Sequence, residues 1–336
     1  MLNNTFGIDL GTSTICIYNH EKKSFFHEKN MIAIDKRAGV IAFGDSAYEM
    51  FERAPDNIKV TYPLTNGVIA DIHNMQTLLK LFITEVSGGG YKNSNYYIAI
   101  PTDVTEVEKR AFYDLVNESN LKARKIFVVD KAVADAIGLG IDVKSSQGTM
   151  IVDVGFNTTE ISVISMGGIV ISKMIKSGGT RFDDAIRNAI KKEYRLVIGG
   201  KSAEKLKMDL EALKSNNETG TVYGRDVATG LPMERFVDTK LVDDCLQEYF
   251  DVIIDNVKII LERTPPELSA DIYKKGLYLT GGGSLVSDLG LQIAKGTGLK
   301  VNLAEEAGKT VIQGLAEIIR NKRLRNVAYT IDELGR

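Results

Sequence analysis

The chain contains no tryptophan, and it has only two cysteines and three histidines among 336 residues. So few cysteines exclude a disulfide framework of the kind that stabilises small secreted domains. Cys16 falls in a predicted strand and Cys245 on the apolar stripe of a predicted helix, so both are interpreted as small core residues in a reducing compartment. The histidines, at positions 20, 27 and 73, lack the spacing of a metal site and are expected at the surface.

Proline and long apolar runs are also scarce. There are six prolines, and no apolar run approaches the length of a membrane-spanning helix. With 44% hydrophobic residues, the chain is expected to form one or two compact domains. Its net charge is −2 with both signs interspersed, which gives no reason to expect a nucleic-acid partner. Strand-like sequence begins within the first ten residues and leaves no room for a signal peptide, so the protein is expected in the cytoplasm.

Two similar segments stand out in what the chain does contain. Residues 6–18 read FGIDLGTSTICIY, and residues 150–164 read MIVDVGFNTTEISVI. In each, an apolar strand ends in Asp-x-Gly, a short polar turn follows, and a second strand rich in β-branched residues comes next. One such turn is weak evidence, because Asp-x-Gly ends many ordinary strands. Two turns in register, far apart in the chain, predict two related halves that face each other across a ligand cleft.

The chemistry expected of these turns is phosphate binding. Their glycines let backbone N–H groups approach a ligand closely, and successive N–H groups form a concave anion site. Asp9 and Asp153 repel phosphate, so a cation such as Mg²⁺ should lie between them and the ligand. A third turn, at residues 281–283, follows a predicted strand and precedes a helix expected from about Leu285. This turn would direct further N–H groups toward the same ligand.

The rest of the chain alternates strands and helices, as expected of two α/β halves with mostly parallel sheets. Residues 25–43 are interpreted as a small strand-rich insertion outside the main core, and polar residues 144–148 as the boundary between the halves. Residues 161–175 are expected to form a hairpin, and residues 215–227 a loop or a short strand pair. Apolar periodicity and a capping-box spacing predict helices at residues 75–86, 105–120, 131–139, 183–194, 203–213 and 239–263.

These turns resemble those of the superfamily that contains actin, the heat-shock ATPases and the sugar kinases. Five segments resemble the bacterial actins of the MreB family in particular, and they occur in the family's order over nearly the whole chain. They are DLGT at 9–12, PLTNGVIAD at 63–71, GRDVATGLP at 224–232, ERTPPEL at 262–268 and LTGGG at 279–283.

The resemblance implies an actin-like α/β fold with two related halves around a nucleotide cleft. Half I would comprise residues 1–144, with a smaller subdomain at about 25–62 and with residues 322–336 returning to it. Half II would comprise residues 145–321, with a smaller subdomain at about 181–250. The family also implies a protein that binds ATP and ADP with Mg²⁺ and polymerises into paired protofilaments beneath the membrane. Cell shape is the implied role, and other MreB paralogues are the further partners implied.

The family's nucleotide contacts map onto the three turns and one helix of this chain. Asp9 and Asp153 would hold Mg²⁺ through water. Glu204 and Lys207 lie three residues apart on a predicted helix, so an ordinary surface ion pair is the alternative for these two. The implied nucleotide-binding positions are Thr12, Ser13, Thr14, Gly155, Phe156, Asn157, Thr158, Gly178, Gly179, Glu204, Lys207, Gly281, Gly282, Gly283 and Ser284.

The chain departs from the family in the first two turns and at position 131. Phe156 and Asn157 replace two glycines of the second turn, and Thr14 stands where the family usually has asparagine. Lys131 stands at the position of the glutamate that orients the attacking water, while its partner Thr158 is retained. A protonated lysine cannot accept a hydrogen bond from that water, so weakened ATP hydrolysis is expected. The pattern is similar to the divergent paralogues of wall-less, helical swimming bacteria. The alternative for Lys131 is an ion pair with Asp135, one helical turn later.

Two further alternatives stay open at the level of sequence. The first is a small-molecule kinase of the same superfamily, although no sugar-binding insertion is evident and Lys131 removes a carboxylate from the cleft. The second concerns the membrane. The loop at residues 87–92 offers one aromatic residue, and a basic cluster could attract anionic lipid or could be an ordinary solvated helix end. That cluster consists of Arg320, Lys322, Arg323 and Arg325.

Overall fold

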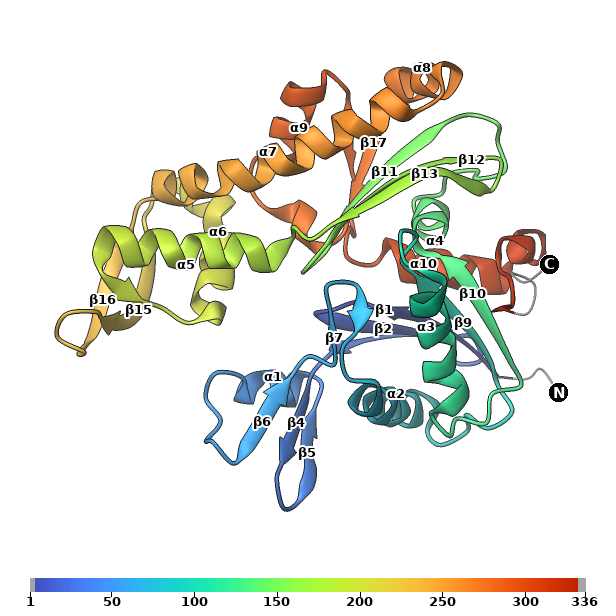
Figure 1. Cartoon of the computed structure of the whole chain (residues 1–336), viewed down its shortest axis with the longest axis horizontal. Coiled ribbons are helices and arrows are strands. Elements are labelled where there is room, and N and C mark those ends of the chain that lie inside the picture. Colours follow the sequence, from blue (N-terminus) through green and yellow to red (C-terminus); the bar gives the residue numbers. More distant parts are fainter. Residues whose placement is uncertain (1–3, 332–336) are drawn as a thin grey trace.

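The computed structural model describes residues 4–331, and its first main sheet is built around the first Asp-x-Gly hairpin (Figure 1). The strand order of this sheet is β10-β9-β1-β2-β3. β1 pairs antiparallel with β2 and parallel with β9, so the hairpin continues into a parallel sheet. The strands are β1 Thr5–Leu10, β2 Thr14–Asn19, β3 Ser24–Lys29, β9 Asn95–Ile100 and β10 Lys125–Asp130.

The second main sheet repeats this arrangement around the second hairpin. Its order is β13-β12-β11-β17-β18, in which β11 pairs antiparallel with β12 and parallel with β17. The two sheets therefore share one topology, as the repeated sequence pattern predicts. The strands are β11 Thr149–Val154, β12 Thr159–Ser165, β13 Gly168–Ile175, β17 Leu277–Thr280 and β18 Val301–Leu303.

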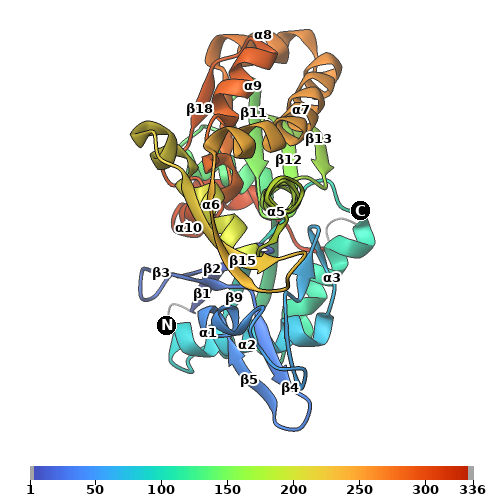
Figure 2. The same cartoon turned by 90° about the vertical axis from the view of Figure 1, so that its left-hand side faces the viewer.

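A smaller unit projects from each half on the side seen in Figure 2. The first contains the sheet β5-β4-β6 and helix α1, closed by a small core that includes Met31 and Ala47. The second contains the sheet β14-β15-β16 with helices α5 and α6. The bounds are β4 Ile32–Asp35, β5 Gly39–Phe43, α1 Asp45–Met50, β6 Ile58–Thr61, α5 Gly179–Tyr194, β14 Leu196–Val197, α6 Gly200–Asn216, β15 Gly220–Asp226 and β16 Pro232–Val237.

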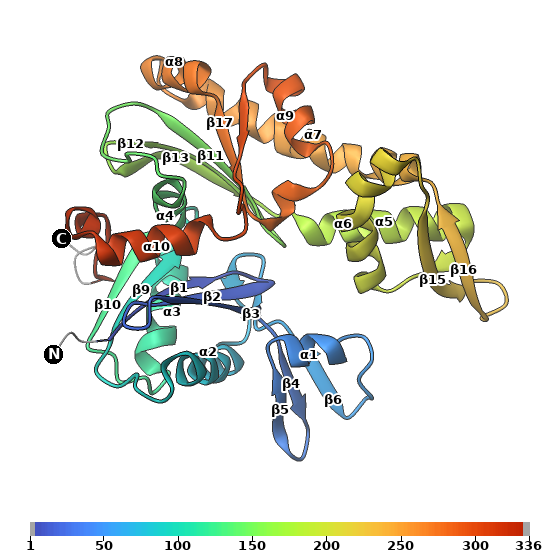
Figure 3. The same cartoon turned by 180° about the vertical axis from the view of Figure 1, so that it is seen from behind.

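The remaining helices cover the main sheets. α2 and α3 pack on the first half and α7, α8 and α9 on the second (Figures 1 and 3). The predicted capping box is present, because Thr105 and Glu108 exchange their hydrogen bonds at the start of α3. The bounds are α2 Ile72–Ser87, α3 Glu106–Glu118, α4 Lys131–Gly138, α7 Thr239–Arg263, α8 Pro266–Lys275, α9 Leu289–Thr297 and α10 Thr310–Arg320. Short elements are β7 Leu64–Thr65, β8 Val68–Ile69 and the 3₁₀ turns Gly282–Leu285 and Lys322–Val327.

Helices α4 and α10 cross between the two main sheets, and their backbones touch (Figure 3). The contact is made by two glycines. A Cβ added at Gly138 would lie 1.8 Å from the carbonyl oxygen of Thr310, and one added at Gly314 would lie 1.8 Å from that of Ala134. No side chain fits at either position. The halves therefore meet at a point where two helix backbones are in direct contact.

The chain after α10 lies against the first sheet. Val128 and Tyr329 exchange two backbone hydrogen bonds, with N···O distances of 2.8 and 3.0 Å. Helix α10, which the sequence-based division assigns to the second half, itself packs on β1, β2 and β9. The last part of the expected return, residues 332–336, lies outside the described residues. Within residues 4–331, no helix combines the length and the apolar character needed to cross a bilayer.

Two expectations about local structure are wrong. β3 is not part of an insertion, because its backbone pairs with β2 over six positions and Phe26 packs on Phe82 with ring centroids 5.3 Å apart. No α-helix starts at Leu285 either. The glycine turn forms a single 3₁₀ turn, Val286 is extended, and Asp288 has a left-handed backbone with φ 67°, so α9 begins only at Leu289.

Candidate functional site

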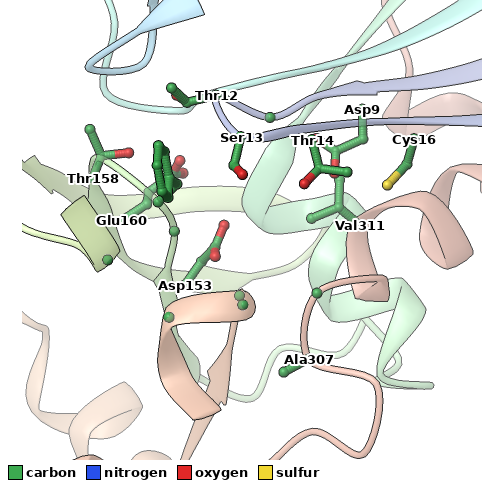
Figure 4. Close-up of a pocket in the computed structure, with 18 of the residues that line it drawn as sticks. Asp9, Thr12, Ser13, Thr14, Cys16, Asp153, Thr158, Glu160, Ala307 and Val311 are labelled. Atoms are coloured by element: carbon green, nitrogen blue, oxygen red, sulfur yellow. The ribbon is translucent and has the colours of Figure 1, made fainter. Parts of the chain in front are cut away.

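The three glycine turns meet at a cavity of about 510 Å³ between the two halves. In Figure 4, Asp9, Ser13 and Thr14 come from the β1–β2 hairpin on one side, and Asp153, Thr158 and Glu160 come from the β11–β12 hairpin on the other. Each aspartate is the last residue but one of the central strand of its sheet. The carboxyl ends of parallel strands are the usual place for ligands in such sheets. The cavity is therefore where the topology directs a ligand.

The first turn is too tight for any residue but glycine at position 11. A Cβ there would lie 2.6 Å from the carbonyl oxygen of Thr14. The side chain of Asn30 donates a hydrogen bond to the Gly11 carbonyl at 2.8 Å and holds the turn from the side of the smaller unit. Thr12, Ser13 and Thr14 all line the cavity. Their hydroxyls and N–H groups are the groups that this turn offers to a ligand.

The second turn is closed by backbone hydrogen bonds to the start of α5. Gly179 donates to the Gly155 carbonyl at 3.0 Å, and Thr180 donates to the Phe156 carbonyl at 2.7 Å. The two residues that replace glycines have partners of their own. Phe156 packs on Tyr62 with ring centroids 5.6 Å apart, and Asn157 donates to the Thr180 hydroxyl at 2.9 Å.

Three of the predicted nucleotide-binding residues do not line the cavity, whereas the other predicted positions do. Asn157 is bonded to residues beside the turn. Gly178 lies beneath the turn, where a Cβ would be 2.6 Å from the Gly155 carbonyl oxygen. Ser284 is buried and donates a hydrogen bond to the Gly281 carbonyl at 2.6 Å. These residues shape the turns rather than face the cavity.

The glycine triplet approaches the second turn at its aspartate. Gly281 has φ +82°, and a Cβ there would lie 2.2 Å from Asp153 Oδ1. A Cβ at Gly283 would lie 2.9 Å from the Gly155 carbonyl oxygen, whereas one at Gly282 would meet nothing within 4 Å. Two of the glycines are therefore required by packing, and the middle one leaves open space in the cavity.

Glu204 and Lys207 both line the cavity, but they are bonded to other partners than each other. Glu204 accepts a hydrogen bond from the Tyr48 hydroxyl at 2.7 Å and lies 3.8 Å from the Lys29 ammonium. Lys207 lies 2.7 Å from Asp183 and donates to the Gly179 carbonyl at 3.2 Å. The surface ion pair considered for them is thus not among the contacts of the described residues. Instead, Glu204 links the two smaller units across the mouth of the cavity.

Lys131 is the first residue of α4, and its ammonium lies 2.6 Å from Asp153 Oδ2. The expected alternative, a pair with Asp135, is wrong. Asp135 is fully buried and accepts a hydrogen bond from the Thr280 hydroxyl at 2.5 Å. Burial lowers the pKa of Lys131, but the attraction of Asp153, Asp9 and Glu160 outweighs it and the net shift is upward. Lys131 is therefore a cation that joins the first half to the second.

Burial raises the pKa of two carboxyls near Lys131, those of Asp9 and Glu160. Burial raises the pKa of Asp9 to about 6, against the attraction of Lys131. Burial likewise raises the pKa of Glu160 to about 7, although Lys131 and two hydrogen bonds from Thr102 oppose it. The cavity thus combines one firmly held cation with acids whose charge is costly.

Asp9 and Asp153 do not fit the predicted magnesium ion as their side chains stand. Mg²⁺ requires a near-octahedral shell of oxygen ligands or ordered waters, and the Lys131 ammonium already occupies one oxygen of Asp153. Within the described chain, no group of three or more His, Cys, Asp or Glu side chains is placed to hold a metal ion.

Sequence reasoning missed several residues of the cavity wall. Glu160 could have been found, because it lies two positions after Thr158 at the start of β12, and residues two apart in an extended chain point to the same side. Lys29 ends β3, Tyr48 reaches the wall residue Glu204 from the first smaller unit, and the loop at Ala307 comes from far along the chain. No local pattern indicates that these three meet the turns.

Comparison with known proteins settles the family. The model of the MreB/Mbl protein family matches residues 3–326. The chain belongs to the MreB/Mbl family. It is 37% identical over 325 residues to the cell shape-determining protein Mbl of Bacillus subtilis, covering 96% of this chain and 97% of that protein. It is 35% identical to the cell shape-determining protein MreB of Escherichia coli K12, covering 94% of this chain and 92% of that protein.

Solved structures of the family agree with the fold. The crystal structure of MreB5 of Spiroplasma citri bound to ADP matches with a TM-score of 0.90 at 33% identity, over 97% of this chain and 98% of that one. The AMPPNP-bound structure of MreB5 matches with a TM-score of 0.89 at 31% identity, over 97% and 99%. The MamK double helical filament, at 21% identity and a TM-score of 0.78, supports the fold alone. The predicted MreB resemblance and actin-like fold are confirmed.

The buried Asp135 of this MreB/Mbl protein makes stability depend on pH. Burial and the charge of Asp153 raise the pKa of Asp135 from 3.8 to about 7 in the folded state. The folded protein therefore binds more protons than the unfolded chain between these values, and stability falls as the pH rises through about 7. We expect the free energy of unfolding of Asp135→Asn, measured by thermal unfolding, to rise relative to that of the parent between pH 5 and pH 8. The relative gain is up to roughly 1.4 kcal/mol per pH unit. If the stabilities of the variant and the parent instead changed in parallel with pH, the pKa of Asp135 would not be raised in the folded protein.

Proposed function

We propose that this chain is an ATP-binding subunit of a cytoskeletal filament that acts in cell shape. The observation that carries the proposal is the cavity between the halves, lined by the two phosphate-type turns and the glycine triplet together. ATP and ADP are the proposed ligands. Relatives support this: MreB5 of Spiroplasma citri is described bound to ADP and to AMPPNP, and Mbl and MreB are described as determinants of cell shape.

Within the cavity, each group has a proposed task. Thr12, Ser13 and Thr14 contact the phosphates from one half, and Gly155 with Thr158 contacts them from the other. Gly281, Gly282 and Gly283 border the nucleoside, and Glu204 and Lys207 face its sugar and base from α6. All of these residues line the cavity, which supports the assignment. The predicted magnesium ion is left out of this proposal, because Lys131 is bonded to Asp153.

We also propose that ATP hydrolysis is slow. The group that orients the attacking water must accept a hydrogen bond from it, and a lysine ammonium only donates. Asp130, the neighbouring carboxylate, accepts a hydrogen bond from the Tyr329 hydroxyl at 3.1 Å and so is engaged elsewhere. Thr158 keeps its place at the cavity wall.

The proposed partner in the filament is a second copy of the chain, in paired protofilaments, or another member of the family. We divide each subunit into two domains that meet near residues 144–148, with α10 shared between them because it packs on the first sheet. Any membrane contact is proposed to be weak and peripheral. The guanidinium of Arg325 donates to the Ile319 carbonyl at 3.0 Å and that of Arg320 to the Ala316 carbonyl at 3.2 Å, so part of the basic cluster is turned back onto the protein.

Nucleotide binding is tested by filling the open space at the glycine triplet. Gly282→Leu places a side chain where nothing lies within 4 Å, so the fold is kept and the cavity is blocked. We expect its affinity for ATP, measured by calorimetry, to fall by at least about 100-fold, or ~2.7 kcal/mol. Gly168→Leu, in the β12–β13 hairpin where nothing lies within 4 Å either, is the matched control and should bind as the parent does. Equal affinity in all three proteins would place the nucleotide elsewhere.

Filament formation is tested on the purified protein by sedimentation and electron microscopy. The protein should pellet and form filaments with ATP. Gly282→Leu should lose the increase in pelleting and in filaments that nucleotide causes in the parent. A parent that stays monomeric across salt, Mg²⁺ and nucleotide conditions would contradict the filament.

A further inference from the structure

The wall of the cavity contains a cation that belongs to the protein. Lys131 lines the cavity, its side chain is 23% exposed, and its ammonium is 2.6 Å from Asp153 Oδ2. Asp9 and Glu160 also line the cavity and attract this ammonium at longer range. Asp9 and Asp153 are the residues that the MreB resemblance assigns to magnesium. The structure thus places a lysine ammonium against Asp153, one of the two aspartates at which a hydrated metal ion was expected.

The charge balance of the site follows from this one residue. With a glutamate at position 131, as the family resemblance implies, the cavity would contain four carboxylates: that glutamate, Asp9, Asp153 and Glu160. Such a site needs a divalent cation before it can accept phosphates, because the like charges repel. With Lys131, three carboxylates face one ammonium, and the sum is less negative by two charges. This change equals the charge of one magnesium ion.

The ammonium also has more N–H donors than its bond to Asp153 uses. A lysine ammonium carries three N–H donors, and within the described chain Asp153 is the ion-pair partner found for this one. The remaining donors belong to a side chain that lines the cavity between the two phosphate-type turns. Donation to phosphate oxygens is the typical role of a lysine in a nucleotide site.

We propose that Lys131 is a built-in counter-ion that takes the place of magnesium, so that this protein binds nucleoside di- and triphosphates without a divalent cation. The proposal rests on the proposed function, since it concerns the same cavity. In it, the ammonium stays bonded to Asp153 and donates its other N–H groups to the phosphates. Asp9 faces the ammonium from the other hairpin and stabilises its charge.

The test is the affinity for ATP, ADP and AMP, measured by calorimetry in excess Mg²⁺ and in excess EDTA. For the parent, the affinity for ATP and ADP should be the same in both conditions within about threefold. Lys131→Met has a side chain of similar length without charge. In EDTA its affinity for ATP and ADP should be lower than that of the parent by at least about tenfold, or ~1.4 kcal/mol. In Mg²⁺ this affinity should recover. Lys131→Arg keeps the charge and should resemble the parent. The affinity for AMP, which lacks the outer phosphates, should change little in any variant.

The outcomes separate this proposal from the one it rests on. Binding by the parent that requires Mg²⁺ would overturn the counter-ion and leave the nucleotide cavity intact. Equal affinity of Lys131→Met and the parent in EDTA would also overturn it, and would make Lys131 a structural tie between the halves. Absence of binding in both conditions would overturn nucleotide binding itself. Circular dichroism of each variant shows that it is folded before its affinity is compared.

Discussion

Lys131→Glu is expected to hydrolyse ATP roughly 10²–10⁴-fold faster than the parent, which is the range that a positioned acid–base or water-orienting group contributes. The substitution restores an acceptor for the attacking water next to Thr158, which lines the same cavity. It also removes the ammonium from Asp153, which frees both aspartates to act with Mg²⁺. The parent lacks both features. Its hydrolysis is expected to be slow under every polymerising condition.

Phosphate release should be followed for the parent, Lys131→Glu and Lys131→Met in the presence of Mg²⁺. The methionine variant removes the lysine without supplying a carboxylate, so it should remain slow. A fast methionine variant would mean that Lys131 inhibits hydrolysis by its charge alone. A parent as fast as glutamate-bearing relatives, with no gain in Lys131→Glu, would show that position 131 has no role in orienting the water.

Gly314→Ala is expected to cost about 3 kcal/mol or more of folding stability, which is large for the addition of one methyl group. The new Cβ would lie 1.8 Å from the Ala134 carbonyl oxygen, and that oxygen belongs to the backbone of α4. A flexible side chain could move aside, but here the two helices must separate. α4 and α10 bury most of their side chains between the main sheets, so their separation opens the core.

The comparison is made by thermal and denaturant unfolding against Gly290→Ala in α9. There the added Cβ would meet its nearest atom at 3.7 Å, which is ordinary contact, and alanine is the better helix former by about 1 kcal/mol. The control should therefore be as stable as the parent or more stable. If Gly314→Ala matched the control, the close approach of α4 and α10 would be wrong.

The sequence predicts the parts of the fold that depend on local pattern. The two hairpins, the capping box at Thr105 and the 25-residue helix α7 all follow from periodicity and turn chemistry within a few residues. The errors arise where a distant partner decides. β3 joins the main sheet because β2 leaves an edge for it to pair with, and a run of alternating residues does not show which edge it will meet.

The same limit applies to the site. The turns and the glycine triplet could be assigned in advance because glycine at a strand end is a local requirement. The partner of Lys131 could not, because Asp135 is one turn away in sequence while Asp153 reaches the lysine only when the halves are assembled. Tyr48 and Glu204 are 156 positions apart, and their contact exists only in the closed arrangement of the smaller units.

That contact bears on how easily this protein changes state. The smaller units are joined across the cavity mouth by the bond from Tyr48 to Glu204, the bond from the Gly200 N–H to Glu52, and the donation of Lys201 to the Tyr48 carbonyl. All lie at partly or fully exposed positions, where each bond contributes only about 1 kcal/mol. Together these three bonds contribute only a few kcal/mol to holding the smaller units together, so a ligand or neighbour that favours a parted arrangement by a similar amount would separate them. A neighbouring molecule that contacts either smaller unit therefore needs only modest binding energy to shift the balance between joined and parted units. Such a change would not require any part of the subunit to unfold.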